Sequence, residues 1–318
     1  HASRAPTFTM EGGTKSPHVF IVSTGVDVAT DEVAKILSRR GVQYTRLDTE
    51  RLPFDAALTS TIPASDSEAL NPEIRLDGAR ISLGEATGVW YRRVRAPEPP
   101  YEMSAGVHEF CVRESRAALV GTLLAQGARI MSSPANIWAA EHKVHQLAAA
   151  KAVGLTIPAT VVTNDPDKVR ECFGVFSGRM IVKPVRTGYV DCGSERRAVY
   201  TSRVLSEDLE DVETAQLSPA IYQPLIDKRC DVRVTVVGSE LFVAEIDSQD
   251  DPAATIDWRR TENPNLPHRR ANLPREVADG VSRLLRSLGL AFGAIDFVRT
   301  PDDRYIFLEV NPNGQWVW

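Results

Sequence analysis

Residues 294–312 read AIDFVRTPDDRYIFLEVNP, two alternating segments that a Pro-Asp-Asp turn separates. This pattern predicts two adjacent antiparallel strands. Glu309 and Asn311 then share one face of the second strand, and hairpin pairing can bring Asp296 beside them. Oxygen ligands from one or two carboxylates, completed by water and phosphate, suit Mg²⁺ carried by a nucleotide. The hairpin therefore predicts a metal site, and the alternative is that these acids are only solvated.

The composition is that of a globular protein. The chain has 318 residues, of which 43% are hydrophobic and 25% charged, so it can form two or three α/β units. A net charge of −5 argues against nucleic acid as the main partner, because phosphate backbones are held by clustered Lys and Arg. No apolar run approaches the roughly 20 residues of a membrane span. We therefore expect no nucleic-acid or membrane partner.

The cysteine spacing indicates the cellular compartment, and the N-terminal segment indicates where the folded part of the chain begins. The cysteines show no CxxC spacing, which predicts reduced thiols in a cytoplasmic protein; they are Cys111, Cys172, Cys192 and Cys230. Residues 1–16 lack the apolar core of a signal peptide. We expect them to be a disordered leader or a cloning remnant.

Three further segments are predicted after this leader. Residues 17–130 begin with a strand, an amphipathic helix and a second strand, which predicts an α/β domain with a βαβ unit. The unit lacks GxGxxG, so no dinucleotide site is inferred. Residues 131–222 predict a small central α+β lobe. Residues 223–318 predict a C-terminal lobe that contains the carboxylate hairpin.

Two lysines precede the hairpin in positions that suit phosphate binding. Lys143 lies on a predicted helix that leads into the central lobe, and Lys183 ends a strand directly before a proline and a glycine-containing loop. An ammonium neutralises phosphate oxygens, and backbone N–H groups of such a loop add donors. Each lysine taken singly is more often a solvated surface residue, and it is their order before the hairpin that favours phosphate binding.

The segment that crosses between the last two lobes has features of an adenine site. Gln223 and the backbone around Ile226 can offer hydrogen bonds to the edge of a base, and apolar Leu225 and Ile226 can cover its faces. Arg233 follows on a strand and could hold a transferred phosphate with its planar fork. Pairing of Arg233 with Asp231 or Asp247 at a sheet edge is the structural alternative.

The order of these elements resembles the ATP-grasp ligases. They are Lys143, Lys183-Pro184, Gln223 to Ile226, Asp231-x-Arg233, Asp296 and Glu309-x-Asn311-Pro312, and the resemblance covers about residues 130–318. It implies a three-lobed α/β (α+β) fold with an N-terminal βαβ pre-grasp domain. It also implies that Lys143 and Lys183 bind the phosphates of ATP, that Gln223, Leu225 and Ile226 bind adenine, and that Arg233 and Lys183 are catalytic. Asp296, Glu309 and Asn311 would hold Mg²⁺.

A narrower resemblance points to the graspetide (microviridin-type) peptide maturases. It rests on Val89 to Arg93, Ser132 to Lys143, Ile181 to Pro184, Ile256 to Arg259 and the closing Asn311-Pro312-Asn313-Gly314-Gln315-Trp316. One departure is His142, where many relatives have Asn, and relatives usually continue into a helix after Trp318. The resemblance implies contacts with the peptide substrate for Arg92, Arg93, Asp257 and Arg259. The arginine-rich stretch 250–270 is a candidate for a lid over this peptide, and the alternative is a solvated surface insertion.

The function that these observations predict is ATP-dependent macrocyclisation of a ribosomal precursor peptide. Glu or Asp side chains would be activated as acyl phosphates and linked to Thr or Ser as esters, or to Lys as amides. The expected cofactors are ATP and Mg²⁺, and the expected partner is a precursor with a leader segment; a homodimer is also allowed. Two alternatives stay open: a RimK-like or other ATP-grasp carboxylate-amine ligase, and a non-catalytic peptide-binding protein with a degenerate nucleotide site.

Overall fold

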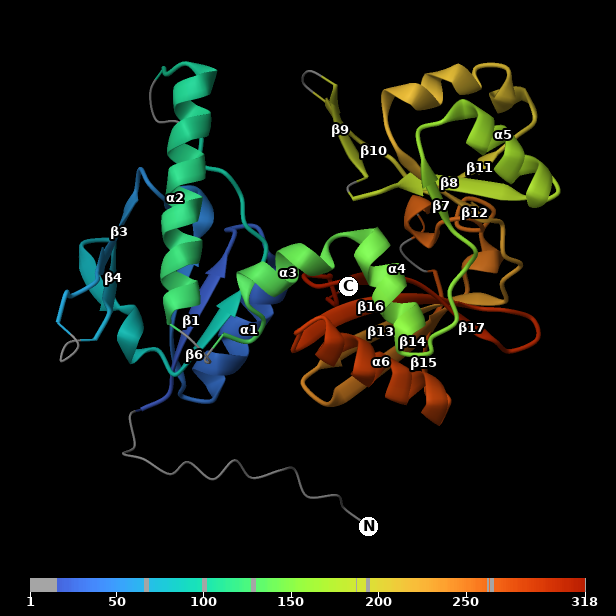
Figure 1. The fold of residues 1–318 in the computed structure, drawn as a ribbon. Coiled ribbons are helices and arrows are strands. Elements are labelled where there is room, and N and C mark those ends of the chain that lie inside the picture. The colour runs from blue at the N-terminus through green and yellow to red at the C-terminus, as the bar shows by residue number, and fades with distance from the viewer. Residues whose placement is uncertain are drawn as a thin grey trace, which may run out of the picture. The chain divides into compact units, whose positions relative to one another are not determined.

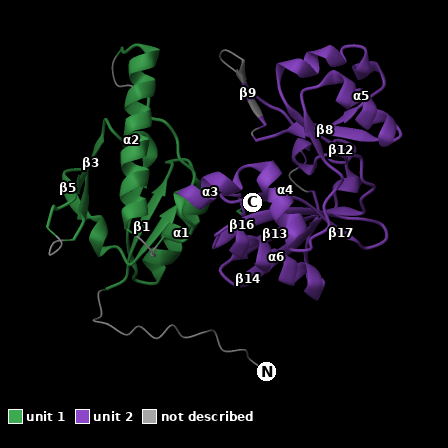
Figure 2. Ribbon diagram, in the orientation of Figure 1, with its two compact units in different colours: residues 1–134, 317 green, residues 135–316, 318 purple. Residues whose placement is uncertain are grey.

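The computed structural model describes residues 16–65, 69–98, 102–126, 130–186, 188–192, 195–261, 263 and 266–317. The chain divides into two compact units, one up to Pro134 and one from Ala135 onward (Figure 2). The expectation of a disordered leader concerns residues 1–16, nearly all of which lie outside the described residues. The further division at residues 222 and 223 stays a prediction.

Unit 1 is built on a parallel sheet in the order β2-β1-β6 (Figure 1). These strands are β1 (His18–Ser23), β2 (Gln43–Asp48) and β6 (Gly88–Tyr91), and α1 (Val28–Arg39) makes the crossover from β1 to β2. The helix ends at Arg39 because Gly41, at φ +65°, takes the left-handed conformation that closes a helix. The expected βαβ unit is thus present.

A second, antiparallel sheet and a long helix complete unit 1. Strands β3 (Ala56–Thr61), β4 (Asn71–Leu76) and β5 (Ala79–Ser82) form the sheet, and α2 (Ala105–Ala125) contributes Leu119 and Leu123 to the same core. The turn between β4 and β5 is Asp77-Gly78, and both residues have positive φ, which is the requirement of a tight hairpin.

Unit 2 contains a small and a large antiparallel sheet (Figure 1). The small one has the order β11-β8-β12-β7 and packs against α5 (Pro166–Val175). Its strands are β7 (Val161–Thr163), β8 (Met180–Pro184), β11 (Ser202–Val204) and β12 (Ala220–Pro224), and a hairpin of β9 (Tyr189–Cys192) and β10 (Glu195–Ala198) follows β8.

The large sheet has the order β15-β14-β13-β16-β17. Its strands are β13 (Cys230–Val237), β14 (Glu240–Ile246), β15 (His268–Ala271), β16 (Phe292–Arg299) and β17 (Tyr305–Asn311). Helices α4 (Lys143–Ala152) and α6 (Arg275–Ser287) contact each other, and α4 packs along β17 (Figure 1). Apolar residues recur every three or four positions along α6, so that Val281, Leu284 and Leu285 lie on one face of the helix and are buried.

One helix expected from the sequence is two helices in the structure. The sequence predicts a continuous helix from Asn136 to Gly154, but α3 (Pro134–Ala140) ends before α4 begins at Lys143. His142 is extended, with φ −87° and ψ 105°, and this conformation interrupts the helical hydrogen bonds. Lys143 therefore occupies the first turn of a new helix.

Short 3-10 turns connect several of these elements. They are η1 (Thr49–Arg51), η2 (Leu83–Glu85), η3 (Glu207–Leu209), η4 (Val212–Leu217), η5 (Ser248–Asp250) and η6 (Trp258–Arg260). The last two lie in the stretch 250–270 or at its border, which the sequence predicts to be aperiodic. Among the described residues, no helix combines the length and apolarity needed to cross a membrane.

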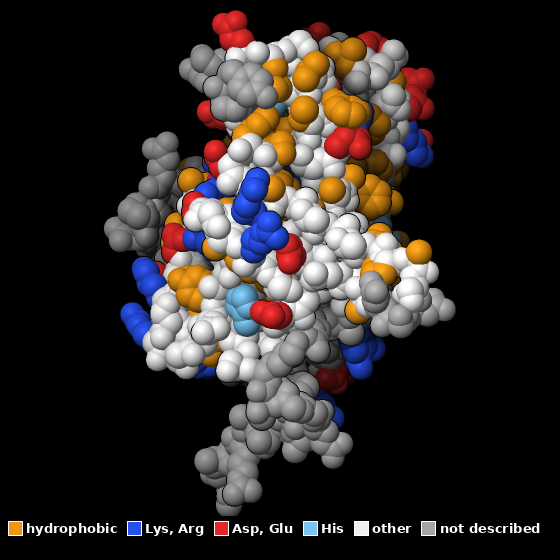
Figure 3. Space-filling model, turned by 90° about the vertical axis from the view of Figure 1, so that its left-hand side faces the viewer, with side chains coloured by type: hydrophobic (Ala, Val, Ile, Leu, Met, Phe, Trp, Pro, Cys, Tyr) orange, Lys and Arg blue, Asp and Glu red, His pale blue; other side chains and the backbone are white. Residues whose placement is uncertain are grey.

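One face of the protein carries charged side chains of both signs. On the face that Figure 3 shows, acidic and basic side chains are interspersed.

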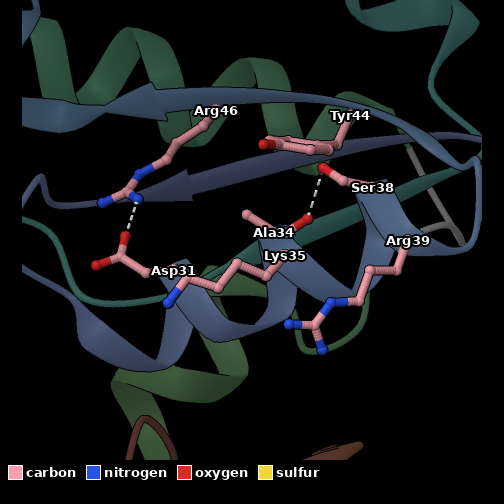
Figure 4. A pocket seen from close by; sticks show the side chains of 7 residues that line it. All are labelled: Asp31, Ala34, Lys35, Ser38, Arg39, Tyr44 and Arg46. Carbon is pink, nitrogen blue, oxygen red and sulfur yellow. Dashed lines mark hydrogen bonds and ion pairs between the residues drawn. The ribbon is translucent and has the colours of Figure 1, made fainter.

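Unit 1 has an open groove between α1 and β2, where Lys35, Arg39 and Tyr44 lie on the rim (Figure 4). An ion pair of 2.5 Å between Arg46 Nη1 and Asp31 Oδ1 closes one end of this groove.

Candidate active site

The β16–β17 hairpin brings together the three oxygen-bearing side chains that the sequence singles out. Asp296 lies directly opposite Glu309 in the strand register. The Asn311 Nδ2 atom is 3.1 Å from Asp296 Oδ2 and 3.4 Å from Glu309 Oε1. Both carboxylates are largely buried, with 8% and 7% of their residue surface exposed. This donor set of two carboxylates and one amide fits a magnesium ion, because Mg²⁺ prefers hard oxygen ligands.

Cations surround the two carboxylates. Arg233 lies opposite Asp296 across β13 and β16, and its Nε and Nη2 atoms are 2.7 and 3.3 Å from the oxygens of Asp296. Lys143 Nζ is 3.1 Å from Glu309 Oε2, and Arg259 Nη1 is 3.6 Å from Glu309 Oε1. The alternative partners of Arg233 are engaged elsewhere, since Asp231 pairs with Lys228 and Asp247 with Arg269.

The two carboxylates differ in their electrostatic environment. Burial raises the pKa of Asp296 above its ordinary value, and Arg233 only partly offsets this effect. Burial also acts to raise the pKa of Glu309, but Lys143, Arg259 and Lys183 outweigh it, so its pKa lies well below the ordinary value. Glu309 is therefore the carboxylate that stays ionised most firmly at neutral pH.

Lys183 is a buried cation at the end of β8. Burial lowers the pKa of its ammonium from 10.5 to about 8, although Glu309 acts in the opposite direction. Within the described part of the chain, no group lies within hydrogen-bond or ion-pair distance of this ammonium. A desolvated cation of this kind is suited to an anionic ligand such as a phosphate, which would supply the missing counter-charge.

An apolar pocket adjoins Lys183. Leu225 and Ile226 line it together with Gln223, whose Nε2 atom donates to Thr160 Oγ1 at 2.9 Å. The other lining residues are Ile181, Thr201, Pro224, Lys228, Thr255, Ile256, Val298 and Leu308. A pocket lined by apolar residues together with a few polar groups suits a flat heteroaromatic ring.

Most of the remaining lining residues are absent from the sequence predictions. Ile181 and Val298 could have been found, because each lies two residues from a predicted site residue on the same strand and therefore on the same face. Leu308 has no such signal. The pairing of β16 with β17 shifts after Asp296, from Glu309 to Phe307, and this irregularity leaves Leu308 without a partner in the register.

The predicted substrate residues fall into two groups. Asp257 and Arg259 lie in the cluster described above: Asp257 accepts from Arg259 Nε and Nη2, both at 2.8 Å, and from Thr201 N at 3.2 Å. These bonds tie η6 to the end of the small sheet. The cation of Arg259 is thereby held beside Glu309.

Arg92 and Arg93 belong to unit 1. The Arg92 side chain is fully buried, and its Nε atom donates to Asp27 Oδ2, which also accepts from Ser23 and Thr30. This location presents no surface to a peptide, so the structure does not support the substrate contact expected for Arg92. Arg93 is exposed and remains a candidate.

Replacement of Lys183 by Met is expected to stabilise the ligand-free protein at pH 7 by up to about 3 kcal/mol, since each pKa unit corresponds to about 1.4 kcal/mol. Below pH 8 the folded wild type carries the full cost of the buried charge. Between pH 8 and 10.5 the folded lysine loses its proton before the unfolded one, so the difference shrinks and vanishes above 10.5. Urea unfolding of both proteins from pH 7 to above pH 10.5 measures this difference in stability, and Lys151→Met, at an exposed position, is the control.

Comparisons with known proteins identify the family to which this chain belongs. Residues 18–137 match the model of the MvdD pre-ATP grasp domain. The macrocyclase MdnB of Microcystis aeruginosa is 32% identical, with a TM-score of 0.77 over 94% of this chain and 92% of that one. The chain belongs to the microviridin-type family of ATP-grasp macrocyclases. No curated protein matches it.

Two further similar structures contain bound ligands. Macrocyclase MdnC of Microcystis aeruginosa, bound with precursor peptide MdnA, is 29% identical with a TM-score of 0.81 over 94% of this chain and 92% of that one. The RiPP-associated ATP-grasp ligase of Chryseobacterium gregarium, in complex with ADP and a leader and core peptide, is 27% identical with a TM-score of 0.86, covering 94% and 90%. The ATP-grasp fold and the family predicted from the sequence are confirmed.

Proposed function

We propose that this macrocyclase uses ATP and Mg²⁺ to link Glu or Asp side chains of a ribosomal precursor peptide to its Thr or Ser hydroxyls or Lys amines. The observation that carries the proposal is the cluster of Asp296, Glu309 and Asn311, surrounded by cations beside an apolar pocket. Oxygen ligands, phosphate-binding cations and an adjoining apolar pocket for the base are the components that phosphoryl transfer from ATP to a carboxylate requires.

Each part of the cluster has a task in nucleotide binding. Leu225, Ile226 and Gln223 would hold the adenine, and Lys143 and Lys183 would neutralise the phosphates. Asp296, Glu309 and Asn311 would hold Mg²⁺, which supplies charge neutralisation at the β- and γ-phosphates. The engagement of Glu309 by Lys143 and Arg259 in this structure means that these cations share its charge before nucleotide binds.

The reaction then has two steps. An oxygen of the substrate carboxylate attacks the γ-phosphorus, the bond to the bridging β–γ oxygen breaks, and ADP leaves. A hydroxyl or amine of the same peptide attacks the acyl carbon of the resulting acyl phosphate, and the carbon–oxygen bond to phosphate breaks. The departing phosphate takes up the proton of the nucleophile. Arg233 and Arg259 would orient the reacting carboxylate and balance the charge that develops on the transferred group.

The test is incubation of the protein with ATP, Mg²⁺ and synthetic precursor peptides rich in Thr and Glu or Asp. We expect the loss of one water and the release of one ADP for each link. Hydroxylamine should divert the activated carboxylate into a hydroxamate that mass spectrometry locates. A mass gain on the peptide would instead support a carboxylate-amine ligase that adds a residue. Peptide binding without any ADP release would support a non-catalytic binding protein.

A further inference from the structure

Gln146 forms a buried connection between α4 and the metal-binding hairpin. Its side chain is almost completely enclosed, with 2% of the residue exposed. The Nε2 atom donates to Val310 O at 2.8 Å and to Ala140 O, and the Oε1 atom accepts from Val310 N at 3.0 Å. The side-chain amide thus satisfies both backbone groups of one residue, as a neighbouring strand would.

The position of Val310 explains why such a connection is needed. β17 is the last strand of its sheet, so half of its backbone groups point away from β16 and have no strand to pair with. Buried backbone groups without a partner are costly, and Gln146 supplies that partner. Val310 lies between Glu309 and Asn311, so the same contact fixes the backbone from which both candidate metal ligands project.

Lys143 lies one helical turn before Gln146 on α4. Lys143 Nζ contacts Glu309 Oε2 at 3.1 Å and donates to Pro184 O at 3.2 Å, next to Lys183. The first turns of α4 therefore touch the hairpin at two points and β8 at a third. A shift of α4 along β17 would change the distance between the phosphate-binding lysines and the metal ligands.

We propose that Gln146 is a positioning residue that sets the spacing between Lys143 and the magnesium ligands Glu309 and Asn311. The proposal rests on the function proposed above, because it assigns Gln146 a task in that same site. The amide of Gln146 both donates to Val310 O and accepts from Val310 N, which an ionised carboxylate of the same length cannot do. Gln146→Met keeps the length and loses all these bonds, whereas the ionised side chain of Gln146→Glu keeps the acceptor and loses the donors.

The experiment uses metal binding as well as activity. Mn²⁺, as a spectroscopic substitute for Mg²⁺, is titrated into the protein with ADP and followed by electron paramagnetic resonance, without peptide. We expect Gln146→Met to weaken Mn²⁺ binding by about 10-fold or more, the size of effect seen when groups that orient metal ligands are removed. The Mg²⁺ concentration for half-maximal ADP release should rise in parallel, while the KM for the peptide stays unchanged.

A matched control separates positioning from stability. Leu147 is the next residue on α4 and is buried, so Leu147→Val perturbs the packing of the same helix and leaves the hydrogen bonds between Gln146 and Val310 in place. At an equal melting temperature, this variant should bind Mn²⁺ as the wild type does. If Gln146→Met is folded and its Mn²⁺ affinity equals that of Leu147→Val, the proposal is wrong.

Two further measurements cover a variant that fails to fold. Gln146→Glu is read by the same titration, and wild-type affinity in it would contradict the proposal. In the wild type, the Val310 amide should be among the slowest of β17 to exchange with solvent, and fast exchange there would also contradict it. Because these readings need no peptide turnover, they stay informative if the wild type releases no ADP and the proposed function itself is wrong.

Discussion

Glu309→Gln is expected to reduce peptide-dependent ADP release by at least about 100-fold, the scale on which loss of a group that stabilises transition-state charge acts. The substitution keeps the size of the side chain and removes its charge. Glu309 is the carboxylate of the cluster with the lowered pKa, and Lys143 and Arg259 contact it directly. Loss of this charge should weaken the proposed magnesium site, and it leaves the surrounding cations without their shared partner.

Measurements of enzyme activity and of unfolding free energy both test the prediction for Glu309→Gln. Initial rates of ADP release at saturating ATP and peptide, taken over a range of Mg²⁺ concentrations, should show a higher Mg²⁺ requirement together with a lower maximum. The variant should also lose roughly 3 kcal/mol of unfolding free energy, since removal of one member of a buried ion pair leaves the other unpaired. Glu240→Gln, at an exposed position of β14, is the control. A Glu309→Gln enzyme with wild-type rates at low Mg²⁺ would exclude Glu309 from the metal site.

Arg233→Ala should also lose turnover by about 100-fold or more, and it should destabilise the fold by roughly 3–5 kcal/mol at neutral pH. The guanidinium of Arg233 makes two hydrogen bonds to Asp296, at 2.7 and 3.3 Å, and both residues are buried. Without this partner, Asp296 must either ionise in a desolvated place or take up a proton. Its pKa, already raised by burial, should rise further.

The pH dependence of stability distinguishes this cause from a general packing defect. An acid whose pKa is raised in the folded state costs stability when the pH is high enough to ionise it, and this cost disappears as protonation becomes complete at lower pH. The deficit of Arg233→Ala relative to the wild type should therefore be smaller at pH 5 than at pH 8 in urea unfolding experiments. Arg304→Ala, at an exposed arginine of the same hairpin, should show no such difference. An equal deficit at both pH values would contradict the electrostatic explanation.

Local patterns in the sequence determined the directions of individual side chains. Alternation along residues 305–311 puts Glu309 and Asn311 on one face, and the two positive-φ residues Asp77 and Gly78 form the turn that their types favour. The order of the lysines, the crossing segment and the hairpin identified the ATP-grasp fold before any contact was known. These features depend on backbone periodicity and on steric preferences within a few residues, so a single sequence contains them.

Only the tertiary structure decided which distant segments meet. Arg259 reaches Glu309 because Asp257 binds both Arg259 and the backbone of Thr201, and no local pattern connects η6 with Thr201 or Glu309. The register shift at Leu308 arises from the pairing of β16 with β17. The helix predicted across His142 is broken there because the backbone of His142 is extended between the end of α3 and the start of α4. The contact of Gln146 with Val310 joins residues 164 positions apart. Such contacts depend on how whole elements pack, and their free energies are set by burial and by partners that the neighbouring sequence does not specify.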